Sequence, residues 1–288
     1  MSGIRLEGIW EQRQGFCAGA NNIYVKMPTY LDKIISDHRE IARSDHRRTS
    51  DLLSMALRRE PCLGFRRALT GDGVSVIAEI KRRSPSKGDL NIGLEPANLA
   101  KSYELNGASC ISILTDEKYF SGSLSDLQLV KESVNIPILR KDFTVCSNDV
   151  LDARLNGADA VLLIVSALSQ QELADLHGFA LELGMDVLVE VHDEAELERA
   201  RAVGADLVGV NQRNLSTFEV DPGKAVSMAK LFDESVVKVC ESGISKPSQM
   251  LELARAGYEA VLVGETLVKS SDPGKTLQEL LSAGRGGF

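Results

Sequence analysis

From Val74 to the C-terminus, the chain alternates between short apolar runs and longer amphipathic stretches. The apolar runs lack alternating polar positions, which is typical of strands buried on both faces of a parallel sheet. We predict strands beginning near Val74, Cys110, Pro137, Ala160, Asp186, Leu207, Val236 and Ala260. The amphipathic stretches between them predict helical crossovers.

The predicted helices are Pro96–Tyr103, Leu124–Glu132, Asn148–Leu155, Gln170–Leu183, Glu194–Ala202, Gly223–Leu231, Pro247–Ala256 and one from Pro273 to about Ala283. A glycine turn follows several of them, at Gly107, Gly157, Gly204 and Gly257. Glycine there supplies the left-handed residue that ends a helix and turns the chain into the next strand. The chain is therefore a series of β/α units.

Repeated β/α units over residues 74–288 predict a closed (β/α)8 TIM barrel, with the preceding helices added as a cap. A doubly wound open sheet is the alternative, but it commonly carries a G-x-G-x-x-G turn after its first strand. No such turn follows the strand near Val74. We therefore favour the barrel.

The N-terminal region divides near Met27. Residues 1–26 show no clear period, and we expect a peripheral or poorly ordered extension. Thr29 is a helix cap, and helical signal then runs to about Leu69, interrupted at Pro61 and Gly64. We expect 27–288 to form a single domain, and we hypothesise that Met27 is the natural start.

Composition narrows the class of protein. The hydrophobic fraction of 43% suits a globular core, and the net charge of -8 argues against nucleic-acid binding driven by bulk charge. No apolar run approaches the length of a membrane span, and no signal peptide is evident. Five scattered cysteines, without a C-x-x-C pair, indicate free thiols in the cytoplasm and no zinc site. We expect His38 and His46 to be solvated on a polar helix.

Charged and polar residues follow the apolar runs again and again. The strand ends carry Glu79 and Lys81, Thr115 and Asp116, Lys141 and Asp142, Ser166, Glu190 and His192, Asn211 and Arg213, Glu241 and Ser242, and Gly264 and Glu265. In a barrel of this kind, these ends meet at the face that holds the active site. Acids and amines packed in an apolar wall are costly unless they are paired, so this constellation predicts a site that a ligand completes.

Two features suggest what the ligand carries. Ser242-Gly243 and Gly264-Glu265 follow the last two strands, where barrels commonly bind phosphate through backbone N–H groups. Ser84, on the loop after the first strand, offers a further hydroxyl. Phe120 and Phe143 lie just beyond the second and third strands and predict an apolar wall for a flat ring.

These stretches resemble the indole-3-glycerol phosphate synthase family. The resemblance rests on Ala78–Ser86, Leu114–Gly122, Pro137–Phe143, Leu162–Val165, Asn211–Arg213 and Glu241–Ile244, in family order and spacing. It implies closure of 1-(2-carboxyphenylamino)-1-deoxyribulose 5-phosphate to indole-3-glycerol phosphate with loss of carbon dioxide and water. It also implies no metal and no organic cofactor.

The resemblance assigns roles to the strand-end residues. Lys141 would be the general acid of ring closure, Lys81 would bind the substrate carboxylate, and Glu190 would act in dehydration. Glu79, Asn211 and Glu241 complete the catalytic set, Arg213 would bind substrate, and Ser84, Ser242, Gly243, Gly264 and Glu265 would hold the phosphate. Glu265 is a departure, since many relatives have a small serine there. We expect Lys81 to lower the pKa of Lys141.

Other functions remain open from the residues alone. A Schiff-base aldolase or a sugar-phosphate isomerase would use Lys141 as a nucleophile on the same fold. A non-catalytic barrel would serve as a scaffold or ligand-binding subunit. For the enzyme we expect a phosphorylated small-molecule substrate, no nucleic-acid or membrane partner, and a monomer or weak homo-oligomer.

Overall fold

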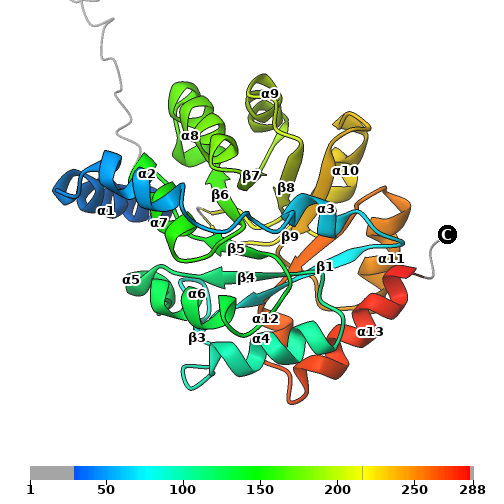
Figure 1. Ribbon diagram of the computed structural model, residues 1–288. Coiled ribbons are helices and arrows are strands. Elements are labelled where there is room, and N and C mark those ends of the chain that lie inside the picture. The colour runs from blue at the N-terminus through cyan, green and yellow to red at the C-terminus, as the bar shows by residue number, and fades with distance from the viewer. Residues whose placement is uncertain (1–28, 216, 286–288) are drawn as a thin grey trace, which may run out of the picture.

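A closed parallel barrel forms the centre of the molecule (Figure 1). The computed structural model describes residues 29–215 and 217–285. Within these ranges, the barrel strands are β1 (Ser75–Ile80), β4 (Cys110–Leu114), β5 (Ile138–Lys141), β6 (Ala160–Ile164), β7 (Asp186–Val191), β8 (Leu207–Asn211), β9 (Val237–Glu241) and β10 (Ala260–Val263). Each strand pairs with the next one along the chain, and β10 closes on β1. The predicted barrel is confirmed, and the open sheet is excluded.

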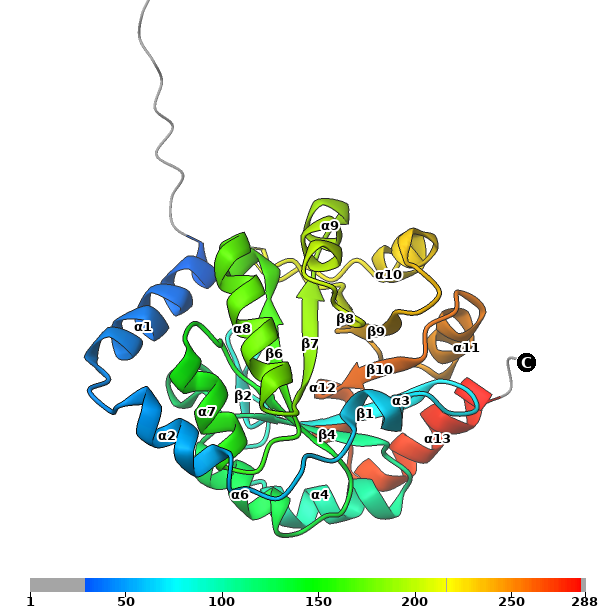
Figure 2. The same ribbon diagram turned by 45° about the horizontal axis from the view of Figure 1, so that its top comes forward.

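The crossover helices surround the strands (Figure 2). They are α4 (Pro96–Leu105), α6 (Leu124–Lys131), α7 (Ser147–Leu155), α8 (Gln170–Glu182), α9 (Glu194–Ala202), α10 (Lys224–Met228), α11 (Pro247–Arg255) and α13 (Pro273–Arg285), with short 3-10 turns η1 (Val165–Ala167) and η2 (Ala229–Leu231). In the described ranges, none of the helices has the length and apolar character needed to cross a membrane.

The glycine turns adopt the predicted conformation. Gly107 and Gly157 have φ values of 94° and 90°. At Gly157, a side chain would also collide, because an added Cβ would lie 2.7 Å from Cγ of Lys131. These turns end α4 and α7 just before β4 and β6, so each strand begins at a fixed point.

Each barrel strand contributes side chains to two hydrophobic cores, one between the barrel and the helices and one inside the barrel. Val76 and Ile111 point outward and pack with the surrounding helices. Ile77 and Leu139 point inward and pack with Phe65 and other residues inside the barrel. Phe65 belongs to the short helix α3 (Phe65–Leu69) and is fully buried. The barrel interior is therefore filled on that side and leaves room for a site only at the other end.

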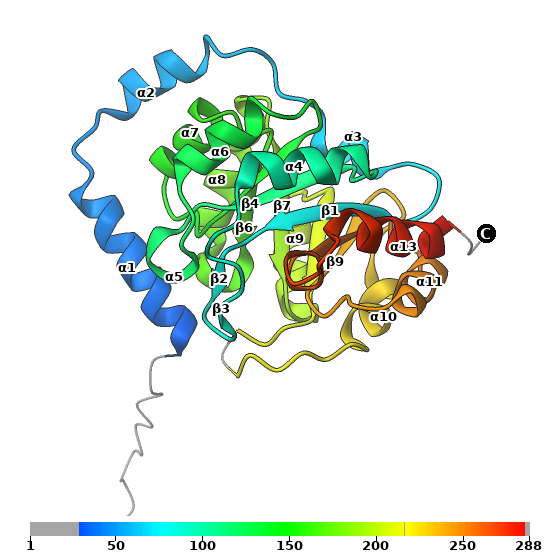
Figure 3. The same ribbon diagram turned by 90° about the horizontal axis from the view of Figure 1, so that it is seen from below.

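Two more helices precede α3, namely α1 (Tyr30–Ser44) and α2 (Thr49–Ala56). Thr29 caps α1 as predicted, since its Oγ1 accepts from the Asp32 N–H at 3.1 Å. Figure 3 shows α1 at the barrel end that carries the loop after β1, with α3 at the opposite end. The proposed extension 1–26 and the proposed start at Met27 lie outside the described residues.

Several short elements were not predicted. The loop after β1 folds into an antiparallel hairpin of β2 (Arg83–Ser84) and β3 (Gly88–Asp89). Helix α5 (Glu117–Phe120) follows β4, and α12 (Glu265–Val268) follows β10. All of them lie in loops at the carboxyl ends of strands, so they shape the rim of the barrel mouth.

Candidate active site

One cavity of about 660 Å³ opens at the carboxyl ends of the strands. Every site residue predicted from the sequence lines it: Glu79, Lys81, Ser84, Phe120, Lys141, Phe143, Glu190, Asn211, Arg213, Glu241, Ser242, Gly243, Gly264 and Glu265. Of the other strand-end residues, Thr115, Asp116, Ser166 and His192 do not line it. The fold therefore gathers residues from all eight barrel strands into one polar mouth with apolar walls, with Leu162 and Ile164 of β6 among the apolar ones.

Lys141 lies at the centre of this mouth, at the end of β5. Its Nζ donates to Oε2 of Glu190 at 3.1 Å and lies 3.4 Å from Oε2 of Glu241. Both carboxylates are buried, with only 1% of each residue exposed. Glu190 comes from β7 and Glu241 from β9, so the lysine bridges two strands that are not adjacent to its own.

The expected effect on Lys141 is wrong in direction. Burial alone lowers the pKa of a lysine, but the carboxylates of Glu190, Glu241 and Glu79 outweigh it and raise the pKa of Lys141 above its usual range. Lys81 does not counteract them, because its Nζ is paired with Oε1 of Glu79. Lys141 is therefore fully protonated at neutral pH.

The two carboxylates beside Lys141 differ in their proton affinity. Burial raises the pKa of Glu241 and, together with the nearby charge of Glu190, outweighs the opposite effect of Lys141. Burial acts on Glu190 in the same way, but Lys141, His192 and Asn211 outweigh it and lower its pKa. When neighbouring environments push two pKa values apart, one group is suited to act as a base and the other to hold a proton.

Glycines make room for the buried carboxylates. A Cβ added to Gly209 of β8 would fall on Oε1 of Glu241, and one added to Gly264 would fall on Oε1 of Glu79. Each carboxylate therefore lies against the bare backbone of a neighbouring strand. Oε1 of Glu241 is buried without a hydrogen-bond partner among the described residues.

Asn211 and Arg213 extend the network along β8 and its loop. Nδ2 of Asn211 donates to Oε1 of Glu190 at 3.1 Å, which fixes that oxygen away from Lys141. Arg213 donates from Nη1 to the carbonyl of Phe218 at 3.0 Å and lines the cavity. The arrangement holds Glu190 in one orientation and leaves a cation for a bound ligand.

The predicted phosphate end is lined by backbone in an unusual conformation. Ser242 and Gly243 have φ values of 67° and 79°, and the Ser242 carbonyl accepts from Nε2 of Gln212 at 2.9 Å. Lys87 and Lys269 line the same cavity but were not predicted. Two lysines near left-handed backbone make this end cationic, as an anion site requires.

Glu265 keeps a negative charge at this end. It pairs with Nζ of Lys269 at 2.7 Å, one helical turn along α12. Burial raises its pKa, but Lys269, Lys87 and Arg213 outweigh the burial and lower it. The departure noted in the sequence is thus balanced by a neighbouring lysine.

An aromatic and aliphatic wall closes one side of the cavity. The rings of Phe120 and Phe143 lie 6.2 Å apart at 42°. Tyr30, Leu31 and Ile34 of α1 complete the lining from above, and the sequence analysis missed them. Their spacing places them on one apolar face of the helix, but that pattern does not tell which surface the face covers.

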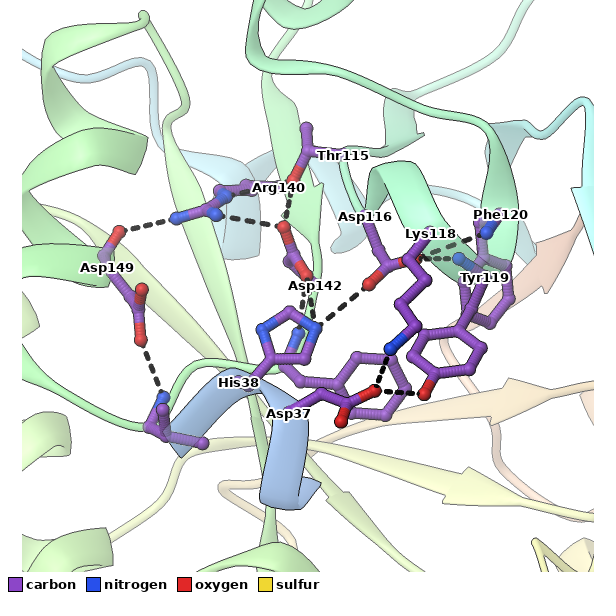
Figure 4. Close-up of polar contacts among 12 residues, drawn as sticks. Asp37, His38, Thr115, Asp116, Lys118, Tyr119, Phe120, Arg140, Asp142 and Asp149 are labelled. Atoms are coloured by element: carbon purple, nitrogen blue, oxygen red, sulfur yellow. Dashed lines mark hydrogen bonds and ion pairs between the residues drawn. The ribbon is translucent and has the colours of Figure 1, made fainter. Parts of the chain in front are cut away.

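His38 of α1 is not solvated, contrary to expectation (Figure 4). Its Nε2 lies 2.9 Å from Oδ2 of Asp116 and 3.8 Å from Oδ1 of Asp142, and its ring packs 5.3 Å from that of Phe143. The polar sequence around His38 predicted that this face of the helix is exposed to solvent. Because α1 docks on the barrel through this face, the face is buried. His46, by contrast, is exposed as expected.

His38, Asp116 and Asp142 have the composition of a metal site, and their ligand atoms lie within 4.8 Å of one another. Their oxygens are already used, however. Asp116 accepts from the Tyr119 N–H at 2.5 Å, and Asp142 accepts from Nη2 of Arg140 at 2.8 Å. The cluster is therefore a hydrogen-bonded network that holds α1 against the mouth.

The family whose description is indole-3-glycerol phosphate synthase matches residues 31–280. The chain belongs to the indole-3-glycerol phosphate synthase family. The family member from a Nocardioides species is 54% identical over 215 residues, which are 75% of this chain and 81% of the relative. Indole-3-glycerol phosphate synthase 1 of Streptomyces coelicolor is 47% identical over 256 residues, 88% of this chain and 95% of the relative.

Membership confirms the resemblance drawn from the strand-end motifs. It makes the chain a carbon–carbon lyase of tryptophan biosynthesis, so the aldolase, isomerase and scaffold alternatives lose their support. A solved structure of low sequence identity shares the fold. The 3-hexulose-6-phosphate synthase of Salmonella typhimurium has a TM-score of 0.60 at 14% identity, covering 75% of this chain and all of its own.

Proposed function

We propose that the cavity closes 1-(2-carboxyphenylamino)-1-deoxyribulose 5-phosphate to indole-3-glycerol phosphate, with Lys141 as acid and Glu190 as base. The observation that supports these roles is the position of Lys141 between two buried carboxylates whose pKa values are pushed in opposite directions. An enzyme of this family must donate a proton to one substrate atom and take one from another. This pair of environments supplies both groups.

In ring closure, an aromatic ring carbon attacks the substrate carbonyl, whose oxygen becomes an alkoxide. A raised pKa keeps the proton on Lys141 until that point, and the alkoxide is a stronger base than an amine, so the transfer runs toward the substrate. Loss of carbon dioxide then restores the aromatic ring. Lys81, paired with Glu79 at the end of β1, lies where it can bind the carboxylate before it leaves.

In dehydration, the hydroxyl formed by ring closure takes up a proton and leaves as water, and a carbon proton is removed, so the step consumes one proton and releases one. Glu190 has a lowered pKa, lines the cavity and accepts from Lys141 through Oε2, so it is the base of this step. Glu241, whose pKa is raised by burial, holds the far side of Lys141, with its Oε2 3.4 Å from Nζ. Phe120 and Phe143 would stack against the flat ring, and Asn211 would orient the substrate through Glu190.

The phosphate would lie at the opposite end. Ser84, Ser242 and Gly243 offer donors there, with Gly264 and Glu265 contributing backbone N–H groups. Arg213 would reach the substrate hydroxyls or carboxylate. We place the enzyme in the cytoplasm, where the free thiols of Cys62, Cys110, Cys146 and Cys240 persist, and expect a monomer or weak homo-oligomer.

The test is indole fluorescence after mixing the full chain with the carboxyphenylamino-deoxyribulose phosphate. Wild type should form indole, whereas Lys141→Ala and Glu190→Gln should each lose at least about 10²-fold in kcat, as expected for a general acid or base. Circular dichroism checks that both variants fold. Indole formation at the wild-type rate by a folded Lys141→Ala enzyme would rule out the assigned acid. Borohydride with substrate should trap no adduct at Lys141.

A further inference from the structure

His192 lies immediately beyond β7. It does not line the cavity, but it contacts Glu190, the proposed base. Its Nε2 is 3.4 Å from Oε1 of Glu190, and its Nδ1 is 2.9 Å from Oε2 of Glu196. The imidazole therefore joins a carboxylate inside the site to one outside it. Nε2 is buried and has no hydrogen-bond partner other than this ion-pair contact among the described residues.

Glu196 holds the ring from the helix side. It belongs to the first turn of α9, and its Oε2 also accepts from the backbone N–H of His192 at 2.8 Å. Its own N–H donates to Oδ1 of Asp193, the cap of the same helix, at 2.9 Å. The Glu196 carboxylate is thus bound to both the backbone N–H and the ring of His192. The imidazole cannot rotate without losing this contact with the first turn of α9.

The two oxygens of Glu190 thus have separate surroundings. Oε1 contacts His192 and Asn211, whereas Oε2 accepts from Lys141, which lines the cavity. We propose that His192, held by Glu196, is a positioning residue that fixes the Glu190 carboxylate with Oε2 toward the substrate. The inference deepens the proposed function, because it rests on Glu190 being the base.

The charges around His192 agree with this role. Burial lowers the pKa of the imidazole, but Glu190 of β7 and Glu196 of α9 outweigh it and raise the pKa to about 10. His192 is thus a cation throughout the neutral range, and it is among the groups that lower the pKa of Glu190. Glu190 in turn pairs with Lys141 of β5, which lies 3.4 Å from Oε2 of Glu241 of β9.

The experiment compares pH profiles of kcat and KM for His192→Gln, Glu196→Gln and the wild type. We expect His192→Gln to lower kcat about 10- to 100-fold with KM changed less than about 3-fold, the range seen when an orienting partner is lost. The acid limb of the kcat profile should move up by about one pH unit or more, because a neighbouring positive charge is gone. Glu196→Gln should shift it in the same direction by less.

His177→Gln is the matched control, since His177 is also a buried histidine but lies in α8 and does not line the cavity. It should leave the acid limb in place. A fall in kcat for His192→Gln without a displaced limb, or an equal displacement in His177→Gln, would overturn the proposal.

The Glu190→Gln variant distinguishes a failure of the His192 proposal from a failure of the proposal that Glu190 is the base. If that variant keeps wild-type activity, the base assignment itself fails. If it is inactive while His192→Gln retains the wild-type profile, only the role of His192 fails. In the Glu190→Gln background, His192→Gln should have no further effect on residual kcat, as for two residues that act as one unit.

Discussion

At the scale of single residues, the site depends on where glycine leaves space. Glu241 is buried against Gly209. Lys141 contacts both Glu241 and Glu190. A carboxylate at this depth keeps its place only because the neighbouring strand has no side chain there. The glycine is thus as much a part of the site as the acid.

Gly209→Ala should lower kcat by about 10²-fold while the barrel still folds. The added methyl group would displace Oε1 of Glu241, and a misplacement of about 1 Å near reacting groups is enough for a loss of that size. Steady-state indole formation measures the loss, and thermal unfolding shows whether the fold survives.

Gly178→Ala provides the comparison, because an added Cβ in α8 meets nothing within 4 Å. It should leave kcat unchanged and stabilise the helix by about 0.5 to 1 kcal/mol. Wild-type kcat in Gly209→Ala would show that Glu241 has another position open to it and that its buried geometry is not required.

At the scale of elements, helix α1 acts as part of the active-site wall. Tyr30, Leu31 and Ile34 reach the cavity, and Arg39 pairs with Glu172 of α8 at 2.6 Å. His38 makes the most buried polar contact of the helix with the barrel loops. The helix was predicted from its cap and period, but its position on the barrel was not.

The docking of α1 should weaken as pH rises. The pKa of His38 is raised: burial lowers it, but Asp116 and Asp142 outweigh the burial, with Arg140 beside Asp142 on the far side. A raised folded-state pKa contributes stability that is complete below pH 6.5 and is lost as pH rises through the folded pKa. His38→Gln should therefore lower Tm by about 3 °C at pH 6 and by less at pH 9.

Thermal scans at both pH values measure this difference, and His46→Gln is the control, because His46 lies just beyond α1 and is exposed. It should leave Tm unchanged at either pH. A His38→Gln deficit of the same size at pH 6 and pH 9 would mean that packing on Phe143, and not the charge, holds the helix.

At the scale of the whole molecule, the two ends of the barrel have different tasks. The mouth holds charged groups that a ligand completes, whereas the other end joins the N-terminal segment to the strands. Asp159, before β6, accepts from the N–H groups of Leu63 and Ile138 at 2.8 and 2.9 Å and pairs with Lys131. Function and stability are therefore separable by substitution.

Asp159→Ala should destabilise the barrel by about 3 kcal/mol, because it leaves two backbone donors and a lysine without their buried acceptor. The KM and kcat of the remaining folded enzyme should be unchanged. Denaturant unfolding and indole formation measure the two effects. Asp175→Ala, on the exposed face of α8, should cost less than about 0.5 kcal/mol. A loss of kcat in folded Asp159→Ala would show that the two ends are coupled.

The sequence by itself determined the barrel and its strands, and it picked out residues that share one cavity. Strand and helix positions follow from local period, caps and glycine turns, and the predicted start at Cys110 is the observed start of β4. The topology then requires that the carboxyl ends of the strands meet. No longer-range information is needed for that step.

Only the tertiary structure decided how those residues affect one another. Lys141 was expected to have a lowered pKa, but its nearest charges are carboxylates from β7 and β9, far away in sequence. The burial of His38 depends likewise on how α1 packs against the barrel. Local pattern fixes which face of an element is apolar or charged, whereas pKa and pairing depend on distances between elements that the chain brings together only on folding.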